Sequence, residues 1–126
     1  MPSPVPPPMH RRERLTTVAN PGARHDYLIV LAGEPRPGIR LEIRYVPDRW
    51  VAEPTGFAAY LGALADLPGG LEALALAVLD DVNNELVPRW AEVRAEGADP
   101  VSHRVVVEDR QPGWDNPHVF ARLERL

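Results

Sequence analysis

The fold of this chain is decided by residues 41–93, which read LEIRYVPDRWVAEPTGFAAYLGALADLPGGLEALALAVLDDVNNELVPRWAEV. The stretch opens with alternating apolar and charged residues, a pattern that predicts a strand with one exposed face. A Pro-Thr-Gly corner at 54–56 then begins a segment with helical spacing, which the Gly- and Pro-rich residues 67–70 interrupt. A second, more apolar helical pattern covers residues 71–86 and ends at Val87-Pro88, where a new strand begins.

Further strand patterns lie on both sides of this stretch. Residues 25–32 are largely apolar and are joined to the strand beginning at Ile39 by the short connection GEPRPG, which predicts an antiparallel hairpin. Residues 90–96 and 102–108 predict a second hairpin around a Gly-Ala-Asp-Pro turn. The order strand, strand, helix, helix, strand, strand predicts an α+β fold, with a four-stranded antiparallel sheet and two helices on one face.

We expect this fold to occupy residues 20–126 as a single domain. Residues 1–19 form a Pro- and Arg-rich leader that includes a basic cluster at Arg11, Arg12 and Arg14. A segment of this composition stays extended and has little to bury, so we expect it to be disordered. The other interpretation is a docking arm.

Composition narrows the possible partners. The net charge is −4, which gives no electrostatic reason to expect binding to nucleic acid or to an anionic membrane. No apolar run approaches the roughly 18 residues needed to span a bilayer. The N-terminus lacks an apolar signal core, which predicts a cytoplasmic protein.

The residue types that the chain lacks exclude several kinds of catalysis. There is no cysteine, and all 14 basic residues are arginine, so thiolate and lysine nucleophiles are excluded. The four histidines have no metal-ligand spacing, so no metal site is expected. Acid–base work by Asp, Glu, His or Tyr, or binding alone, is what these residues allow.

Three titratable residues are candidates for such chemistry. Glu72, near the start of the second helix, is either a helix-start acid favoured by the helix dipole or a carboxylate that anchors a ligand through paired N–H bonds. Glu53 precedes the first helix and either caps it or lines a pocket. His103 alternates with valines of the last strand. Its imidazole is either packed in the core or acts as a general base. Asp80 and Asp81 are expected to be solvated.

Several short motifs of the central stretch together resemble the tunnelling fold (T-fold), most closely its QueF-type nitrile reductases. These motifs are Arg44-Tyr45-Val46-Pro47-Asp48, Glu53, Tyr60-Leu61, Leu71-Glu72, Pro88-Arg89-Trp90 and Glu92-Val93, with looser matches at Asn20-Pro21, Tyr27 and Gln111-Pro112-Gly113. The resemblance implies a ββααββ domain that oligomerises through its sheet. It also implies that Glu72 lies where the family anchors a purine- or pterin-like ring.

The chain departs from the family where the reduction takes place. The family carries a catalytic cysteine and a following aspartate between the first two strands, where this chain has only GEPRPG. The family's histidine beside the anchoring glutamate is Leu71 here. The residues expected to help hold NADPH, around Thr55 to Ala59, are small or apolar. We therefore expect neither nitrile reduction nor a cofactor.

These observations predict an oligomeric, cofactor-independent acid–base enzyme, of the cyclisation or isomerisation type, in a biosynthetic pathway. Its substrate would be a cyclic or heteroaromatic small molecule bound at a subunit interface. Glu72 would orient it, and Glu53 or His103 would transfer protons. Leu71, Trp50 and Trp90 are the further substrate-binding candidates. The alternative is a non-catalytic ligand-binding or scaffold oligomer that keeps the shell of the fold.

Overall fold

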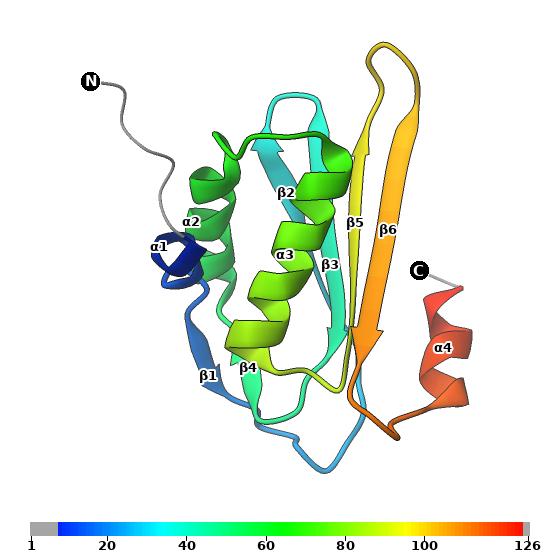
Figure 1. Cartoon of the computed structure of the whole chain (residues 1–126). Helices are drawn as coiled ribbons and strands as arrows, with labels where there is room; N and C mark the ends of the chain where they lie inside the picture. Colours follow the sequence, from blue (N-terminus) through cyan, green and yellow to red (C-terminus); the bar gives the residue numbers. More distant parts are fainter. Residues whose placement is uncertain (1–7, 125–126) are drawn as a thin grey trace.

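The structure is a computed structural model that describes residues 8–124. Its main sheet has the strand order β2-β3-β5-β6, with every neighbouring pair antiparallel. The bounds are β2 Ile29–Arg36, β3 Ile39–Val46, β5 Trp90–Gly97 and β6 His103–Arg110. Helices α2 (Pro54–Leu64) and α3 (Leu71–Leu86) lie on one face of this sheet (Figure 1). The α+β prediction is confirmed, and the element order is compatible with a T-fold.

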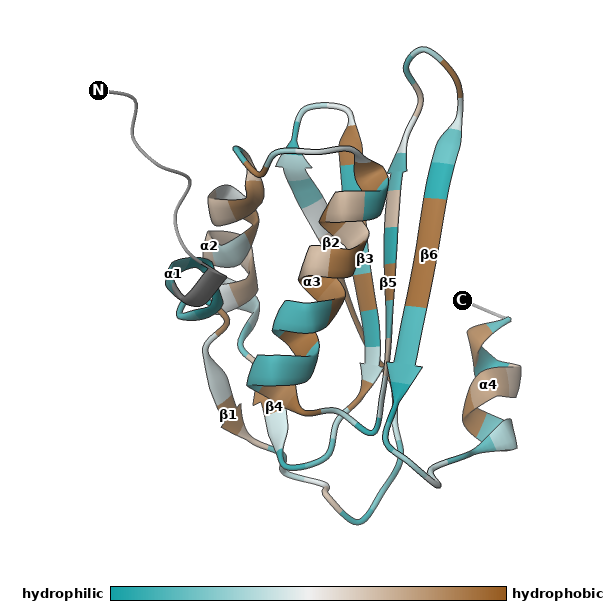
Figure 2. Cartoon of the chain, in the orientation of Figure 1, coloured by the Kyte–Doolittle hydropathy of each residue, from teal (hydrophilic) through white to brown (hydrophobic). Residues whose placement is uncertain are grey.

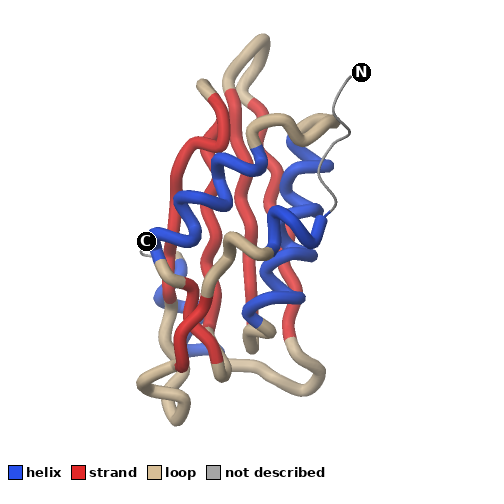
Figure 3. The backbone as a smooth tube through the Cα atoms, turned by 90° about the vertical axis from the view of Figure 1, so that its left-hand side faces the viewer, coloured by secondary structure: helices blue, strands red, loops and turns tan. Residues whose placement is uncertain are grey.

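The core forms between the two helices and the apolar face of the sheet. Residues at alternate positions of β3 and β5 point toward the helices, and Leu41, Tyr45 and Val93 are completely or almost completely buried. The apolar stripe of α3 meets them, and Figure 2 shows that the last turns of this helix are more hydrophilic than its first half. Figure 3 shows both helices running along the strands rather than across them. Burial of this stripe is the main force that holds α3 on the sheet.

The first hairpin differs from its prediction. The segment expected to connect the strands mostly continues β2, and the turn is confined to Pro37 and Gly38, the latter at φ 81°. The register of β2 against β3 shifts between Gly33 and Arg36, and Pro35 lies within this irregular part. Proline is tolerated there because β2 is an edge strand, where a missing N–H need not cost a ladder hydrogen bond.

The prediction of a disordered leader is wrong for residues 8–19. Helix α1 (Pro8–Arg12) packs against α2 and α3, and Leu15 is buried in the core. Strand β1 (Thr17–Ala19) pairs with β4 (Trp50–Ala52) in a separate two-stranded sheet. The preceding part of the predicted leader, residues 1–7, lies outside the described residues.

The leader is ordered because its arginines reach a buried carboxylate. Asp81 of α3 is completely buried, although solvation was expected. Its oxygens accept hydrogen bonds from Arg11 Nε at 2.6 Å, Arg12 Nε at 2.7 Å and the Tyr60 hydroxyl at 2.5 Å. Burial, and then the neighbouring charge of Asp81, raises the pKa of Tyr60, so this hydroxyl is the donor at neutral pH.

The opposite face of the sheet is covered in two different ways. At one end, α4 (Pro117–Leu123) packs on it, and Val119 forms a small apolar cluster with Val46 and Trp90. Elsewhere the face carries alternating charges, with Arg44 Nε 2.8 Å from Glu42 and further ion pairs beside it. Helix α4 and these ion pairs therefore cover part of the sheet face that α2 and α3 leave open. Self-association stays a prediction.

Candidate functional site

The structure brings two of the predicted catalytic residues into contact. Glu72 lies in the first turn of α3 and His103 is the first residue of β6, and His103 Nε2 is 2.8 Å from Glu72 Oε1. Helix α3 packs along β5 and β6, which carries its start to the end of β6. His103 lies on the same side of the strand as Val105 and Val107, as the alternation predicted.

The Glu72 carboxylate is held in its ionised form. A hydrogen bond from its own backbone N–H, and then the contact with His103, lowers the pKa of this group. The contribution of a carboxylate with a lowered pKa to stability is present above its ordinary pKa and is lost as the pH falls through the lowered value. Glu72 is thus a hydrogen-bond acceptor at neutral pH rather than a proton donor.

The same carboxylate serves the start of the helix. The N-cap residue Gly70 offers no side chain to the free N–H groups of the first turn, and Glu72 folds back toward them. A Cβ on Gly70 would lie only 3.3 Å from Glu72 Oε2. Each carboxylate oxygen can accept more than one hydrogen bond, so this role leaves capacity for a ligand.

A hollow of about 510 Å³ opens beside His103, the partner of Glu72. It lies between the β2–β3 turn, the start of α3 and the β5–β6 turn, and its lining includes Arg36, Leu71, Asp99 and His103. Leu71 is only 7% exposed, so it contributes to the core as well as to the wall of the hollow. Cationic, anionic and apolar groups thus surround one cavity at the end of the sheet.

The structure does not bring Glu53 to this hollow. It occupies the N-cap position of α2 without a side-chain cap bond, and its backbone N–H donates to Thr16 O at 2.9 Å. Helices α2 and α3 are antiparallel, so α2 begins where α3 ends, at the opposite end of the helical layer from Glu72 (Figure 1). Within one chain, Glu53 cannot share a substrate with the Glu72–His103 pair.

The two candidate tryptophans also lie elsewhere. Trp50 is 43% exposed and lines a separate hollow of about 330 Å³ with Asp48, Arg49 and Val87. Trp90 is almost completely buried under α4, and its Nε1 donates to Glu108 Oε2 at 2.7 Å. Trp90 is therefore a packing residue in this chain, because no face of its ring is open to a ligand.

A polar network that the sequence did not identify as a unit lies at the other end of the sheet. Asp48 accepts from Arg89 at 3.3 Å and from Gln111 at 3.0 Å, and its backbone oxygen accepts from Asn20 at 2.7 Å. The Tyr27 hydroxyl donates to Asn20. These residues belong to the family motifs, which could have shown that they meet. Their contacts tie together four separate parts of the chain.

Arg89 connects this network to Asp26. The carboxylate of Asp26 accepts from Arg89 at 2.9 Å and from Asn116 at 2.9 Å. Burial alone would raise the pKa of Asp26, but hydrogen bonds from Asn116, Arg89 and Trp114 outweigh it and lower this pKa. The network is thus a set of satisfied charges that fixes the chain around this end of the sheet.

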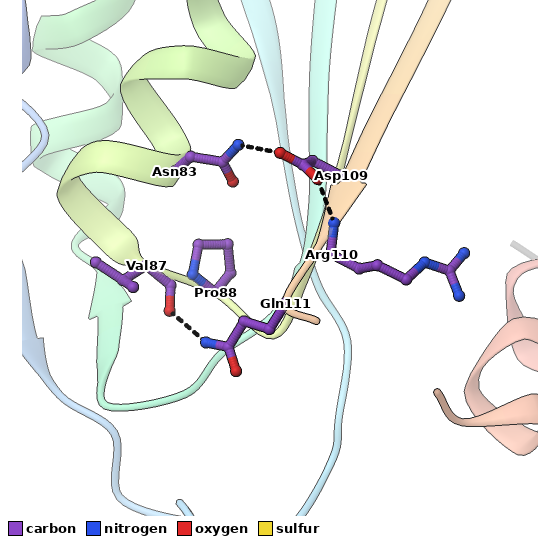
Figure 4. A pocket seen from close by; sticks show the side chains of 6 residues that line it. All are labelled: Asn83, Val87, Pro88, Asp109, Arg110 and Gln111. Atoms are coloured by element: carbon purple, nitrogen blue, oxygen red, sulfur yellow. Dashed lines mark hydrogen bonds between the residues drawn. The ribbon is translucent and has the colours of Figure 1, made fainter. Parts of the chain in front are cut away.

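A third hollow, of about 230 Å³, borders the same network (Figure 4). Asn83 donates to Asp109 at 3.0 Å across it, and Gln111 donates to the backbone oxygen of Val87. The polar groups drawn there bond to one another rather than converge on a common point. Among residues 8–124, no group of three His, Cys, Asp or Glu side chains is arranged to hold a metal ion.

Comparison with known proteins gives one consistent family. The chain is 30% identical over 125 residues to the NADPH-dependent 7-cyano-7-deazaguanine reductase of Nitrosococcus oceani, covering 89% of this chain and 96% of that protein. A reductase of the same name from Acidithiobacillus ferrooxidans is 25% identical over 129 residues, covering 92% of this chain and 91% of that protein. No family model matches the chain.

The similarity therefore extends over nearly the whole domain, well beyond the central motifs. It includes the first hairpin, where this chain has a tight turn and no cysteine. In the part of the chain that the structure describes, no helix is both long and apolar enough to cross a membrane. By its relatives and its element order, the chain belongs to the family of QueF-type 7-cyano-7-deazaguanine reductases.

Proposed function

We propose that this protein binds a small heteroaromatic ring of the deazaguanine type at Glu72 and does not reduce it. The contact between Glu72 and His103 at the edge of a hollow of about 510 Å³ carries this proposal. An ionised carboxylate accepts paired N–H bonds from an amidine-like ring edge. The relatives are named for a ring that has such an edge.

The chain's own residues do not fit NADPH. Its phosphates need cationic or backbone donors, and α2, the helix expected to help hold them, has no arginine or lysine. The exposed residues of its first two turns include Thr55, Ala58 and Ala59, which offer one hydroxyl between them. We therefore assign no step to this cofactor.

His103 is the proton-transfer group in our proposal. An imidazole can both accept and donate a proton, and a carboxylate at hydrogen-bond distance fixes the orientation of its ring. A ligand bound to Glu72 would lie next to this imidazole. Rearrangements that need only proton transfer, such as cyclisation or isomerisation, are the reactions this pair could assist without a cofactor.

The second candidate function is ligand binding or scaffolding without catalysis. It is favoured by the exposure of the pair, since the side chains of Glu72 and His103 are 63% and 45% exposed. Proton transfer between side chain and substrate gains most where water is excluded. A neighbouring subunit that covers the hollow favours catalysis, whereas a permanently open hollow favours binding alone.

Replacement of Glu72 by glutamine tests the proposal. Glu72→Gln replaces one acceptor oxygen with a donor, which should weaken binding of 7-cyano-7-deazaguanine by about tenfold or more. The melting temperature should hardly change, because an exposed residue in the first turn contributes little to stability. Calorimetric titration and thermal melting measure the two quantities.

Glu85→Gln is the matched control, because Glu85 lies on the same helix but in its last turn. It should bind the ring like the wild type. Equal affinity in Glu72→Gln and the wild type would make Glu72 a helix-start acid only. It would also remove the proposed site.

A further inference from the structure

The hollow beside Glu72 has a cation at its other end. Arg36 is the last residue of β2, and His103 is the first residue of β6. These strands are the two edges of the sheet, so three strand spacings separate their backbones, about 14 Å in all. The hollow thus reaches across the whole end of the sheet, with Arg36 on one side and His103, the partner of Glu72, on the other.

The guanidinium of Arg36 is held only by a weak hydrogen bond within the described protein. Its Nη1 donates to Leu67 O at 3.4 Å, a long hydrogen bond to the loop that precedes α3. A guanidinium has five N–H donors, and two parallel donors match the two oxygens of a carboxylate. The bond to Leu67 orients the group and leaves most of its donors for a ligand.

The remaining charge in the lining favours one orientation of such a ligand. Asp99, on the β5–β6 turn, lies near the His103 side of the hollow. An anionic substituent would be repelled from Asp99 and Glu72 and attracted to Arg36, whereas N–H donors would be attracted to the carboxylates. The charges therefore suit a ligand with donors at one end and an anion at the other.

We infer that the ring bound at Glu72 carries a carboxylate, and that Arg36 binds this group and sets the specificity of the site. This inference rests on the proposed function, because it takes Glu72 as the anchor of the ring. It adds the chemical class of the ligand, a heteroaromatic carboxylic acid, in place of the uncharged nitrile for which the relatives are named. Arg36 is a specificity-determining residue here and takes no part in proton transfer.

The test is a titration of the full-length protein with three compounds on one ring. They are 7-cyano-7-deazaguanine and the same ring with a carboxamide or a carboxylate in place of the nitrile. The carboxylate should bind the wild type at least about tenfold more tightly than the other two, as expected for a charge-assisted contact. Arg36→Gln should abolish this advantage, so that the three compounds bind the variant with similar affinities.

Arg40→Gln is the control with the same change of charge at the same hairpin. Arg40 is exposed, pairs with Glu42 and Glu96, and is not part of this hollow's lining. It should keep the advantage of the carboxylate. Thermal melting of both variants shows that they are folded.

The outcomes separate this inference from the proposed function. If all three compounds bind equally and Glu72→Gln weakens the binding of each, Glu72 is still the anchor of the ring and the role proposed for Arg36 is wrong. An equal loss of the carboxylate advantage in Arg36→Gln and Arg40→Gln also overturns the inference, because it reports net charge rather than a contact. If no compound binds the wild type, both the proposed function and this inference are wrong.

Discussion

A carboxylate that is fully buried among apolar side chains needs a partner for each oxygen, and Asp81 has three. Its position could have been read from the helix, since residue 81 follows the buried Val78 by three positions and therefore lies at the border of the same stripe. A polar residue on an apolar stripe indicates a buried partner. The sequence could not name that partner, because Arg11 and Arg12 are about 70 residues away.

We predict that Asp81→Asn strongly destabilises the protein. The substitution keeps the size of the side chain but leaves the largely buried Arg11 without its counter-ion. Removing one partner of a buried ion pair costs about 3–5 kcal/mol. Chemical denaturation followed by circular dichroism measures the loss.

Asp80→Asn is the natural control, since Asp80 precedes it on the helix and is exposed. Its effect should stay within about 0.5 kcal/mol. Similar stability of the two variants would mean that α1 and its arginines add little to the fold.

The candidate site could be predicted only in part, for reasons that lie in single residues. The alternation around His103 indicated its face correctly, but its contact with Glu72 depends on how α3 packs along β6. Glu53 lies apart from them within one chain. Two sequential helices on one face are antiparallel, so the start of the first cannot lie beside the start of the second.

At the scale of elements, long periodic segments were predicted and short ones were not. Helices α2 and α3 and the four strands of the main sheet have patterns that local sequence carries by itself. Elements α1, β1 and β4 have five residues or fewer, and such segments are stable only through tertiary contacts. Gly56 illustrates this dependence, because a Cβ there would lie 2.7 Å from Arg14 O.

Helix α3 ends in a strained conformation. Val87 occupies the C-cap with φ 45° and ψ 55°, a left-handed conformation that is strained for a β-branched residue. Val87→Gly should relieve this strain and lose little packing, because the side chain is 54% exposed. After the entropy cost of a glycine, the gain should be about 1 kcal/mol.

Val101→Gly provides the comparison, since Val101 is 66% exposed and has no positive φ. This variant should lose about 0.5–1 kcal/mol through the greater freedom of its unfolded chain. The two melting temperatures should therefore move in opposite directions. A loss in both would mean that the side chain of Val87 makes contacts worth more than its strain.

At the scale of the whole molecule, the edges of the main sheet are its least protected parts. Edge strands β2 and β6 expose Val30 and Val106, which are 41% and 47% accessible. Unpaired backbone groups on an edge strand pair readily with another chain. The charged outer face is already neutralised by its own ion pairs, so association is expected through the edges.

We predict a homo-oligomer larger than a dimer, since a subunit with two open edges has two places to pair. Light scattering after size exclusion at micromolar concentration measures its mass. Val106→Lys should reduce the mass by placing a charge on the edge, whereas Leu76→Lys on the exposed side of α3 should not. A monomeric wild type would exclude assembly through the edges.

This protein is not expected to catalyse the reaction for which its relatives are named. In the family that the chain belongs to, nitrile reduction is expected to begin with a thiolate that adds to the nitrile carbon and forms a thioimide. None of the 126 residues is a cysteine, and the hairpin expected to carry the nucleophile turns within two residues. The chain has no lysine, and its two serines are Ser3 and Ser102. The protein should therefore show no oxidation of NADPH in the presence of 7-cyano-7-deazaguanine, while the Nitrosococcus oceani reductase, assayed in parallel, should show it.

Ring binding by the same sample, measured by calorimetry, would establish that the inactive protein is folded and its site intact. Protein-dependent NADPH oxidation coupled to loss of the nitrile would contradict this prediction, and would require a nucleophile that no side chain of this chain is expected to supply.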